Sequence, residues 1–215
     1  MKEYWESRYI SEGKIWGEIP SKTAEYAVIL FQKFNIKKIL VPGSGYGRNT
    51  NLFSKNGFDV VGIEISDTAI NIAKVHDPLT KFLNISIFDN NIFDKLLKEV
   101  PFDAIYCYNT LHLFPKKERQ KMLRICYDQL KENGFIFFVV MSECDFSYGK
   151  GRETEKNTYE SKAGRPVHYF SEKDLVKHFK GFSIIEIGVF EEKESHGEQG
   201  PHIHHLRYIF AEKII

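Results

Sequence analysis

Short apolar segments alternate with amphipathic segments along most of this chain, and this alternation constrains the fold more than any other feature of the sequence. Several of the apolar segments are hydrophobic at nearly every position, which is typical of strands that are covered by helices on both faces. Strands are predicted at residues 38–41, 59–64, 84–88, 102–106, 135–141, 183–190 and 206–212. Strands that alternate with helices predict βαβ units and a mostly parallel sheet.

The amphipathic segments predict helices at residues 21–34, 48–56, 66–75, 91–100, 115–131 and 171–179. Ser66 and Ser171 stand where two of these helices begin, and a serine hydroxyl there can accept a hydrogen bond from a free backbone N–H. The last two predicted strands have no helix between them, so we expect them to pair antiparallel. The expected architecture is α/β: a Rossmann-like fold with a seven-stranded, mostly parallel sheet, a C-terminal antiparallel strand pair and helices on both faces.

Length and composition favour one domain. The chain has 215 residues, of which 42% are hydrophobic. A chain of this length can bury one sizeable core, because domains commonly split only beyond about 250 residues. We therefore expect a single domain over residues 1–215, with an N-terminal helical cover at 1–35 and active-site loops at 142–168 and 191–205. Loops of that length inside a compact domain are usually functional or disordered.

Charge and cysteine content argue against several classes of partner and location. The 30 basic and 29 acidic side chains leave a formal charge of +1, so no global field attracts the chain to nucleic acid or to anionic lipid. No apolar run approaches the roughly 20 residues of a membrane-spanning helix. The three cysteines, Cys107, Cys126 and Cys144, have no metal-like spacing. We expect a cytoplasmic protein, monomeric or homodimeric, that acts on a small-molecule acceptor and binds neither nucleic acid nor membrane.

The segment ILVPGSGYGR places three glycines between a predicted strand and a predicted helix. Gly43, Gly45 and Gly47 can adopt positive φ angles and let a ligand approach the backbone amides at the helix N-terminus. The next predicted strand ends in Glu64, whose carboxylate can accept hydrogen bonds from ribose hydroxyls. Asp89 follows the third predicted strand, where it can accept a hydrogen bond from the exocyclic amine of adenine. Together these features predict a nucleoside cofactor.

At these residues the chain resembles the class I S-adenosylmethionine-dependent methyltransferases. The first motif of that family is an acidic residue, any residue and then Gly-x-Gly-x-Gly, and here it reads Val41-Pro42-Gly43-Ser44-Gly45-Tyr46-Gly47. The resemblance implies S-adenosyl-L-methionine as the cofactor, in a site formed by Gly43, Ser44, Gly45, Gly47, Glu64, Ile65, Asp89, Asn90, Cys107 and Tyr108. Trp16 either covers the cofactor with other N-terminal aromatic residues or packs the N-terminus onto the core, and we assign it to the cofactor site.

Val41 departs from the family motif, because most members carry Asp or Glu at this position, where the acid helps to hold the methionine amine. The Val-Pro-Gly variant is similar to the thiopurine, thiol and halide methyltransferases. The N-terminal pattern of WxxRY followed by WGEIPS is similar to the tellurite-resistance-like small-molecule methyltransferases. Both branches act on small, often soft nucleophiles, so the resemblance implies methyl transfer to a small-molecule acceptor.

Candidate residues for acceptor binding and catalysis lie first in two segments. His112 and Asn109 follow the fourth predicted strand, at the sheet edge where ligands bind in open α/β sheets. His112 is either a catalytic base or acceptor contact, or a buried histidine that is satisfied by the backbone. Within the expected polar lid at 142–168, Tyr159 is a candidate for substrate binding and His168 for catalysis.

The segment HGEQGPHIHH contains four histidines: His196, His202, His204 and His205. On an extended segment His202 and His204 share one face, which could ligate a metal with His196. A polar pocket rim at a Gly-Pro turn, substrate contact and proton transfer are the alternatives. We assign His196, His202 and His204 to substrate binding and predict no metal site.

Methyl transfer is an in-line displacement at a sulfonium carbon, so the protein mainly has to align the nucleophile with the methyl group and exclude water. A general base is needed only where the acceptor arrives protonated. Val41 leaves open a non-catalytic protein that binds S-adenosylmethionine as a sensor or partner subunit. A NAD-dependent dehydrogenase is disfavoured, because the pyrophosphate motif needs glycine at its sixth position, where Arg48 stands.

Overall fold

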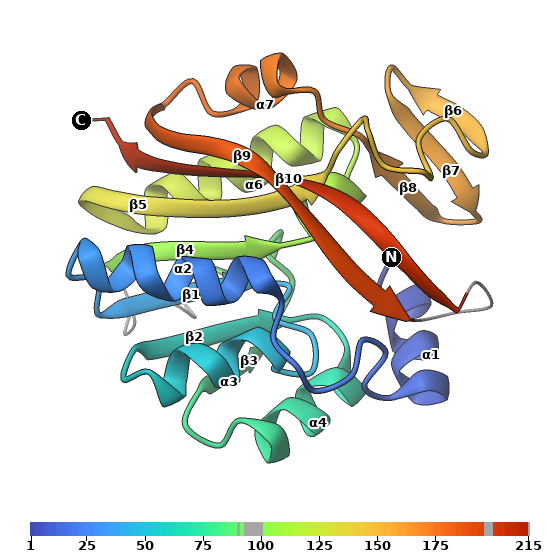
Figure 1. The fold of residues 1–215 in the computed structure, drawn as a ribbon. Coiled ribbons are helices and arrows are strands. Elements are labelled where there is room, and N and C mark those ends of the chain that lie inside the picture. The colour runs from blue at the N-terminus through green and yellow to red at the C-terminus, as the bar shows by residue number, and fades with distance from the viewer. Residues whose placement is uncertain (90, 93–100, 196–199, 215) are drawn as a thin grey trace.

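The computed structural model describes residues 1–89, 91–92, 101–195 and 200–214. Seven strands form the main sheet in the order β3-β2-β1-β4-β5-β10-β9 (Figure 1). Their bounds are β1 Lys38–Pro42, β2 Asp59–Glu64, β3 Lys81–Asn84, β4 Phe102–Tyr108, β5 Leu130–Met141, β9 Phe182–Ser195 and β10 Pro201–Lys213. The first five are parallel to one another, whereas β10 runs antiparallel to both β5 and β9. The prediction of a mostly parallel, seven-stranded sheet with an antiparallel pair is confirmed.

Helices cover both faces of this sheet. The described helices are α1 Lys2–Glu12, α2 Lys22–Lys33, α3 Arg48–Lys55, α4 Asp67–His76, α6 Lys116–Gln129 and α7 Glu172–His178. Because successive strand residues point to opposite faces, Ile39 packs with Phe31 of α2 in one core, whereas Leu40 packs with Met122 of α6 and Phe179 of α7 in the other. The alternation of β1 side chains thus divides the interior into two apolar layers.

Serine side chains cap the N-termini of α4 and α7, as predicted. Ser66 Oγ accepts a hydrogen bond from the backbone N–H of Ala69 at 3.0 Å, and Ser171 Oγ accepts one from that of Asp174 at 3.2 Å. The hydroxyl oxygens therefore satisfy donors that the first helical turn leaves free. The helix predicted at 91–100 falls almost wholly outside the described residues.

The third strand lies earlier in the chain than the predicted 84–88, and that prediction is wrong. β3 pairs in parallel with β2, and its last residue, Asn84, lies opposite Glu64. After Asn84 the chain leaves the sheet. Ile85 and Phe88 are apolar because they pack against the core beneath α6, not because they belong to a strand.

The segment 142–168 is not an irregular loop as expected. It contains an antiparallel three-stranded sheet of β6 Arg152–Glu155, β7 Thr158–Lys162 and β8 Arg165–His168. The sheet is small, and β6 and the end of β7 are solvent-exposed, so its strands carry many polar residues and lack the apolar alternation that predicts a half-buried strand.

The segment 191–205 is likewise mostly strand, because β9 and β10 continue as a hairpin beyond the predicted ends at 190 and 206. Burial alternates along the extension: Glu192 and Glu194 are buried, whereas Glu191 and Lys193 are exposed. The buried positions are acidic, so this part of the strand lacks the apolar alternation that predicts a strand.

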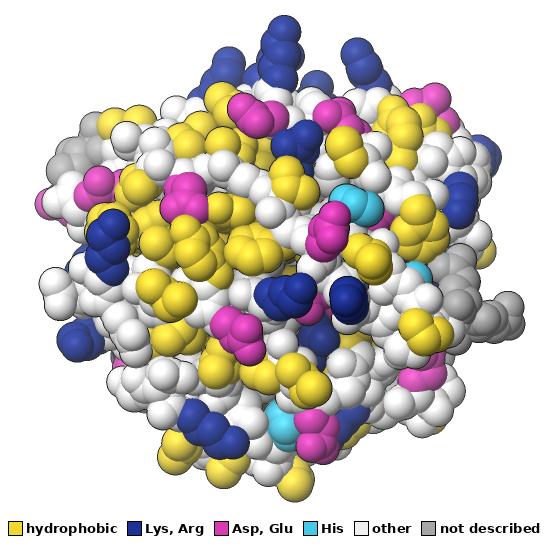
Figure 2. Space-filling view, viewed as in Figure 1, with side chains coloured by type: hydrophobic (Ala, Val, Ile, Leu, Met, Phe, Trp, Pro, Cys, Tyr) yellow, Lys and Arg dark blue, Asp and Glu magenta, His cyan; other side chains and the backbone are white. Residues whose placement is uncertain are grey.

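The far end of the β9–β10 hairpin, α1 and the three-stranded sheet lie at the end of the main sheet to which β1, β2 and β4 point (Figure 1). Acidic and basic side chains are interspersed on the face seen in Figure 2, with hydrophobic side chains gathered between them. Exposed hydrophobic residues of β9 are Ile184, Ile185 and Val189. No helix in the described part of the chain is long and apolar enough to cross a membrane.

Candidate functional site

A cavity of about 1130 Å³ opens at the carboxyl ends of β1, β2 and β4. In open α/β sheets ligands bind where the strand order reverses, and here that point lies between β1 and β4, because β2 follows β1 on its other side. The cavity is also lined by residues of α1, β8, β9 and β10. Segments far apart in the sequence therefore enclose a site whose floor is the sheet edge.

The turn after β1 brings bare backbone to the cavity. Gly43 has φ +66° and Gly45 has φ +56°, conformations that L side chains rarely adopt. A Cβ on Gly43 would lie 2.4 Å from Thr110 Oγ1, and one on Gly45 would lie 2.9 Å from the Tyr9 hydroxyl. Both positions therefore require glycine. Gly47, with φ +85°, begins α3 and packs against α4 instead of lining the cavity.

Glu64, at the end of β2, is buried and faces this turn. Its Oε2 accepts a hydrogen bond from Gly45 N at 3.0 Å, and its Oε1 accepts from Ile65 N at 2.7 Å and Ser66 N at 2.9 Å. Burial raises the pKa of Glu64, although these backbone hydrogen bonds act in the opposite direction. A carboxylate offers about four acceptor positions, so Glu64 keeps capacity for a ligand hydroxyl.

The wall next to Glu64 is formed by the segment that follows β3. Asn84 Nδ2 donates to the carbonyl oxygen of Glu64 at 3.3 Å and so joins the ends of β2 and β3. Ile65 and Ile85 supply apolar surface, and Asp89 also lines the cavity. The combination of a carboxylate, apolar surface and a further acid suits a nucleoside. Asn90, also expected here, lies outside the described residues.

Cys107 and Tyr108, at the end of β4, were both predicted to bind the cofactor, but their side chains point in opposite directions. Cys107 points into the core under α6, where burial raises its pKa to about 12, and it does not line the cavity. Tyr108 points the other way, lines the cavity and donates a hydrogen bond to Glu194 Oε1 at 3.2 Å. Asn109 follows with φ +50°, and its buried Oδ1 has no hydrogen-bond partner in the described part of the chain.

A buried ion pair that the sequence did not predict closes one side of the cavity. Arg48 Nη2 lies 3.4 Å from Glu194 Oε1, and the two side chains are 9% and 4% exposed. Arg48 Nη1 also donates to the Trp16 carbonyl oxygen at 3.2 Å, and its guanidinium lies 5.5 Å from the ring centre of Tyr108. Arg48 thereby ties the start of α3 to the hairpin and to the N-terminal segment.

Aromatic residues of the N-terminal segment form the adjoining wall. Trp16 stacks on Tyr46 with 6.2 Å between ring centres and 11° between planes, and Trp5 and Tyr9 pack beside Trp16. The Tyr46 hydroxyl donates to the Gly17 carbonyl oxygen at 2.7 Å. Trp5, Tyr9 and Trp16 all line the cavity, so α1 and the turn that follows it cover the site.

His112 lies in the cavity wall, and its protonation state limits its chemistry. Its Nδ1 accepts a hydrogen bond from Met141 N at 3.2 Å. Burial, together with the nearby Arg165 cation, lowers the pKa of His112 to about 3. The ring is therefore neutral near pH 7 and carries its proton on Nε2, so it can donate a hydrogen bond but is a weak base.

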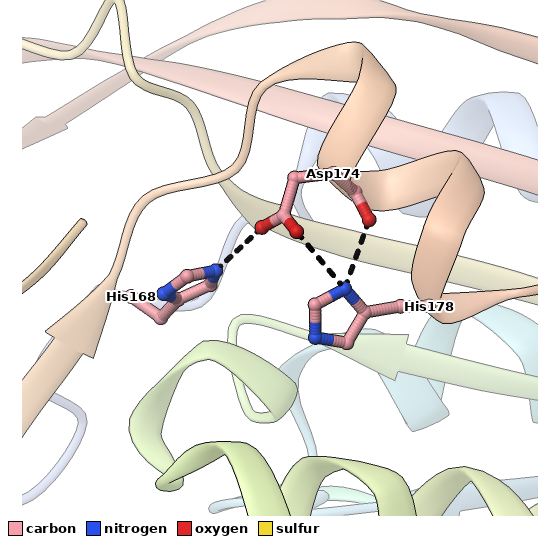
Figure 3. Close-up of side chains that lie close together, drawn as sticks. All are labelled: His168, Asp174 and His178. Carbon is pink, nitrogen blue, oxygen red and sulfur yellow. Dashed lines mark hydrogen bonds and ion pairs between the residues drawn. The ribbon is translucent and has the colours of Figure 1, made fainter. Parts of the chain in front are cut away.

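The structure places His168 and Tyr159 outside the cavity lining. His168 Nε2 lies 2.7 Å from Asp174 Oδ2, and the His178 Nδ1 of the next helical turn lies 2.9 Å from the Asp174 carbonyl oxygen (Figure 3). The other His168 nitrogen lies 2.8 Å from Thr158 Oγ1. These contacts tie β8 to α7.

Tyr159 packs against two other tyrosines, Tyr148 and Tyr169, at ring-centre distances of 5.3 and 6.1 Å. His202 and His204 do line the cavity, from the hairpin end of β10. His196 lies outside the described residues.

Comparison with known proteins identifies a domain in this chain. Residues 39–134 match a protein-family model described as "Methyltransferase domain". The chain is 30% identical over 103 residues to the ubiquinone biosynthesis O-methyltransferase of Coxiella burnetii, and this alignment covers 47% of this chain and 42% of that protein. It is 25% identical over 114 residues to the Acinetobacter baylyi protein of the same name, and this alignment covers 52% of this chain and 47% of that protein. The aligned region thus spans about half the length of these curated relatives.

Solved structures match over nearly the whole chain. A structure from a study of disulfide-to-thioacetal conversion in echinomycin biosynthesis has a TM-score of 0.75 and 16% identity, covering 99% of this chain and 91% of that one. The Burkholderia thailandensis 1,6-didemethyltoxoflavin-N1-methyltransferase, solved with S-adenosylhomocysteine, has a TM-score of 0.70, 19% identity and coverage of 100% and 87%. TehB from Haemophilus influenzae has a TM-score of 0.65, 16% identity and coverage of 99% and 67%. At these identities the similarity establishes the fold.

Proposed function

Because the chain carries a methyltransferase domain at residues 39–134 and has the fold of the class I S-adenosylmethionine-dependent methyltransferases, we propose that it transfers a methyl group from S-adenosylmethionine to a small-molecule acceptor. The observation that carries the proposal is the hydrogen bond from Gly45 N to Glu64 Oε2, which joins the glycine turn to a buried carboxylate at the cavity wall. A bare backbone turn next to a carboxylate is the chemistry that a nucleoside with a free ribose diol requires.

The residues present fit such a cofactor. The cavity is larger than the roughly 300–1,000 Å³ of typical single-ligand sites, so it can hold a nucleoside cofactor and a second small molecule. Side chains on Gly43 and Gly45 would collide with Thr110 and with the Tyr9 hydroxyl, so the glycines keep the backbone of the turn open to a ligand. Glu64 would hold the ribose, with Ile65 and Asp89 beside the base.

Val41 lacks the carboxylate that most members of the family place near the methionine amine. Asn109 Oδ1 is a buried acceptor without a partner among the described residues, and Asn109 precedes Thr110, which packs against Gly43. We propose that Asn109 accepts the hydrogen bond from the amine that an acid at position 41 would otherwise receive. This assignment uses a neutral acceptor in place of a charged one.

The bound cofactor supplies a methyl group on a sulfonium, and the residues around it then have to align the acceptor and exclude water. The aromatic wall of Trp5, Tyr9 and Trp16 provides apolar surface that excludes water. His112 is neutral, so it acts by donating a hydrogen bond to the acceptor and not by removing its proton. The proposal therefore predicts an acceptor that arrives as an anion, or one whose proton is lost by another route.

We also propose that residues 1–215 work as one domain, since α1, β8 and the β9–β10 hairpin all line the same cavity. Three free cysteines, two of them buried, favour a reducing compartment such as the cytosol. A monomer or a homodimer is compatible with this arrangement.

Calorimetric titration with S-adenosylhomocysteine tests the proposal. Wild-type protein should bind it, and Glu64→Gln should bind at least about tenfold more weakly, because a hydrogen bond to a charged group contributes about 1.5–3 kcal/mol. Glu192→Gln is the matched control: Glu192 is also a buried glutamate that accepts backbone hydrogen bonds, from Lys22 N, but it does not line the cavity. This control should keep wild-type affinity.

Absence of binding to wild type, or equal affinity in wild type and Glu64→Gln, would contradict the proposal. Tighter binding of NADH than of S-adenosylhomocysteine would favour a dehydrogenase. Labelled S-adenosylmethionine with phenols, thiols and amines then separates an enzyme from a sensor, since a sensor binds the cofactor and methylates none of them.

A further inference from the structure

We propose that Glu194, His202 and His204 bind a divalent first-row transition-metal ion at the wall of the cavity. One ligand atom from each of the three residues lies within 4.8 Å of the others. All three residues line the cavity, although they come from the two antiparallel strands β9 and β10. The set of two imidazoles and one carboxylate matches the ligands of catalytic zinc and non-haem iron sites.

The hydrogen bonds of the two histidines determine which ring nitrogens face the site. His202 Nδ1 lies 2.7 Å from the Gly200 carbonyl oxygen, which can only accept, so Nδ1 carries a proton. His204 Nδ1 lies 3.0 Å from Asp145 Oδ2. Asp145 Oδ2 also accepts from His205 N at 2.9 Å, so it acts as an acceptor toward His204 as well.

Both Nε2 atoms therefore present lone pairs in their neutral forms, and they lie only 3.1 Å apart. Glu194 Oε2 lies 4.0 Å from His204 Nε2 and supplies the negative charge that complements a bound cation.

The distance between the two nitrogens fits a bound metal ion. Two nitrogens bound to one ion at about 2.0–2.1 Å lie roughly 2.8–3.4 Å apart for bond angles between 90° and tetrahedral, and the observed separation is 3.1 Å. Glu194 Oε1 is held by Arg48 and Tyr108, while Oε2 lies 4.0 Å from His204 Nε2. Binding of the same ion would draw Oε2 closer to the two imidazoles.

The supporting contacts also match those of metal sites. A ligating histidine usually donates its other N–H to a carboxylate or a carbonyl, which fixes the ring and raises its basicity. His204 has such a carboxylate in Asp145, and His202 has such a carbonyl in Gly200. The side chains of Glu194 and His204 are 4% and 13% exposed, so an ion held by them would be shielded from bulk water.

The cluster of His168, Asp174 and His178 offers a contrast, because its ligand atoms are also close together (Figure 3). There Arg119 Nε donates to His178 Nε2 at 3.3 Å, so a guanidinium cation already occupies that nitrogen. Thr158 and Asp174 take the two nitrogens of His168. This cluster lies outside the cavity and serves to join β8 to α7.

If the proposed methyltransferase function holds, the ion would act on the acceptor. Three protein ligands leave open positions, and an acceptor hydroxyl or thiol bound there would lose its proton more easily. That would supply the deprotonated acceptor that the neutral His112 cannot generate. The acceptor class is then a small molecule with an ionisable oxygen or sulfur.

Metal binding can be tested without the cofactor. Protein freed of metal with a chelator is titrated with Co²⁺ and followed by visible absorption, and with Zn²⁺ by calorimetry. Wild type should bind one ion, and His202→Gln/His204→Gln should bind at least about 100-fold more weakly. Asp145→Asn should weaken binding by roughly 10- to 100-fold, as for other residues that orient a ligand.

His205→Gln is the matched control, because His205 is the next residue on β10, its Nε2 lies 3.5 Å from Glu191, and it does not line the cavity. It should bind the ion as wild type does. Thermal unfolding of each variant checks that it is folded. Absence of binding to wild type, or binding that survives the double substitution, would overturn the proposal. Titration with S-adenosylhomocysteine is a separate measurement, so failure of the methyltransferase function would be seen independently.

Discussion

The two ends of the cavity are built from different materials. The cofactor end consists largely of backbone: the glycine turn after β1, and three N–H groups that hold the Glu64 carboxylate. The other end consists of side chains, such as Arg165, His202 and His204, which come from β8 and β10. Side chains on a rigid scaffold can be exchanged without changing the fold. We therefore propose that the backbone-built end holds the cofactor and that the side-chain-built end selects the acceptor.

The largest expected effect comes from adding one methyl group at the backbone-built end. Gly43→Ala should lower the free energy of unfolding by about 3 kcal/mol, because a left-handed alanine costs roughly 1–2 kcal/mol and overpacking costs a further 1–3 kcal/mol. The added Cβ would meet Thr110 Oγ1 at 2.4 Å. Affinity for S-adenosylhomocysteine should fall as well, since relief of the clash displaces the turn. Urea unfolding and calorimetry measure the two effects.

Gly57→Ala is the control for this change. Gly57 also has positive φ, at +84°, but nothing lies within 4 Å of the position of its Cβ. It should lose about 1 kcal/mol of stability and no affinity. If Gly43→Ala behaved like Gly57→Ala, the cofactor end would be more adaptable than its backbone construction indicates.

A smaller effect is expected for a histidine beside the side-chain-built end but outside the cavity. His168→Ala should reduce the free energy of unfolding by about 2 kcal/mol, because it removes the hydrogen bonds of this buried ring with Asp174 and Thr158. Affinity for S-adenosylhomocysteine and turnover per folded molecule should stay at the wild-type level. Loss of turnover at unchanged stability would instead place His168 in the catalytic machinery.

The effect that is smallest near neutral pH concerns the pH dependence of stability. The pKa of His112 is about 3 in the folded protein and near 6.5 when it is exposed, so the unfolded chain takes up a proton first as pH falls. The stability provided by neutral His112 is therefore complete above about pH 6.5 and declines as pH falls toward 3. Burial lowers the pKa of His168 and His178 too, and both contribute in the same direction.

His112→Asn keeps an acceptor for Met141 N but removes the titrating ring. Below about pH 6, its free energy of unfolding should change less steeply than that of wild type, by up to about 1.4 kcal/mol per pH unit. Denaturant unfolding at a series of pH values measures this slope. Identical slopes in the two proteins would mean that His112 titrates normally in the folded state.

The sequence was most informative where neighbouring elements alone create the site. Gly43, Gly45 and Glu64 lie on β1, β2 and the turn between them, and adjacent parallel strands necessarily bring their carboxyl ends together. The same locality allowed the antiparallel pair of β9 and β10 to be predicted from the absence of an intervening helix. The strand at 84–88 was misplaced because apolar residues that pack beneath a helix resemble a strand when only composition is considered.

The order of the elements, the glycine turn and the acid that faces it could be predicted from the sequence, because they depend on periodicity and on short connections. The set of side chains that share the cavity depends on tertiary packing. Arg48 meets Glu194 across 146 positions, and strand register sends Tyr108 to the cavity and Cys107 to the core. A shift of one residue in register would reverse that choice. Such contacts depend on how distant segments pack, and no local pattern in the chain records them.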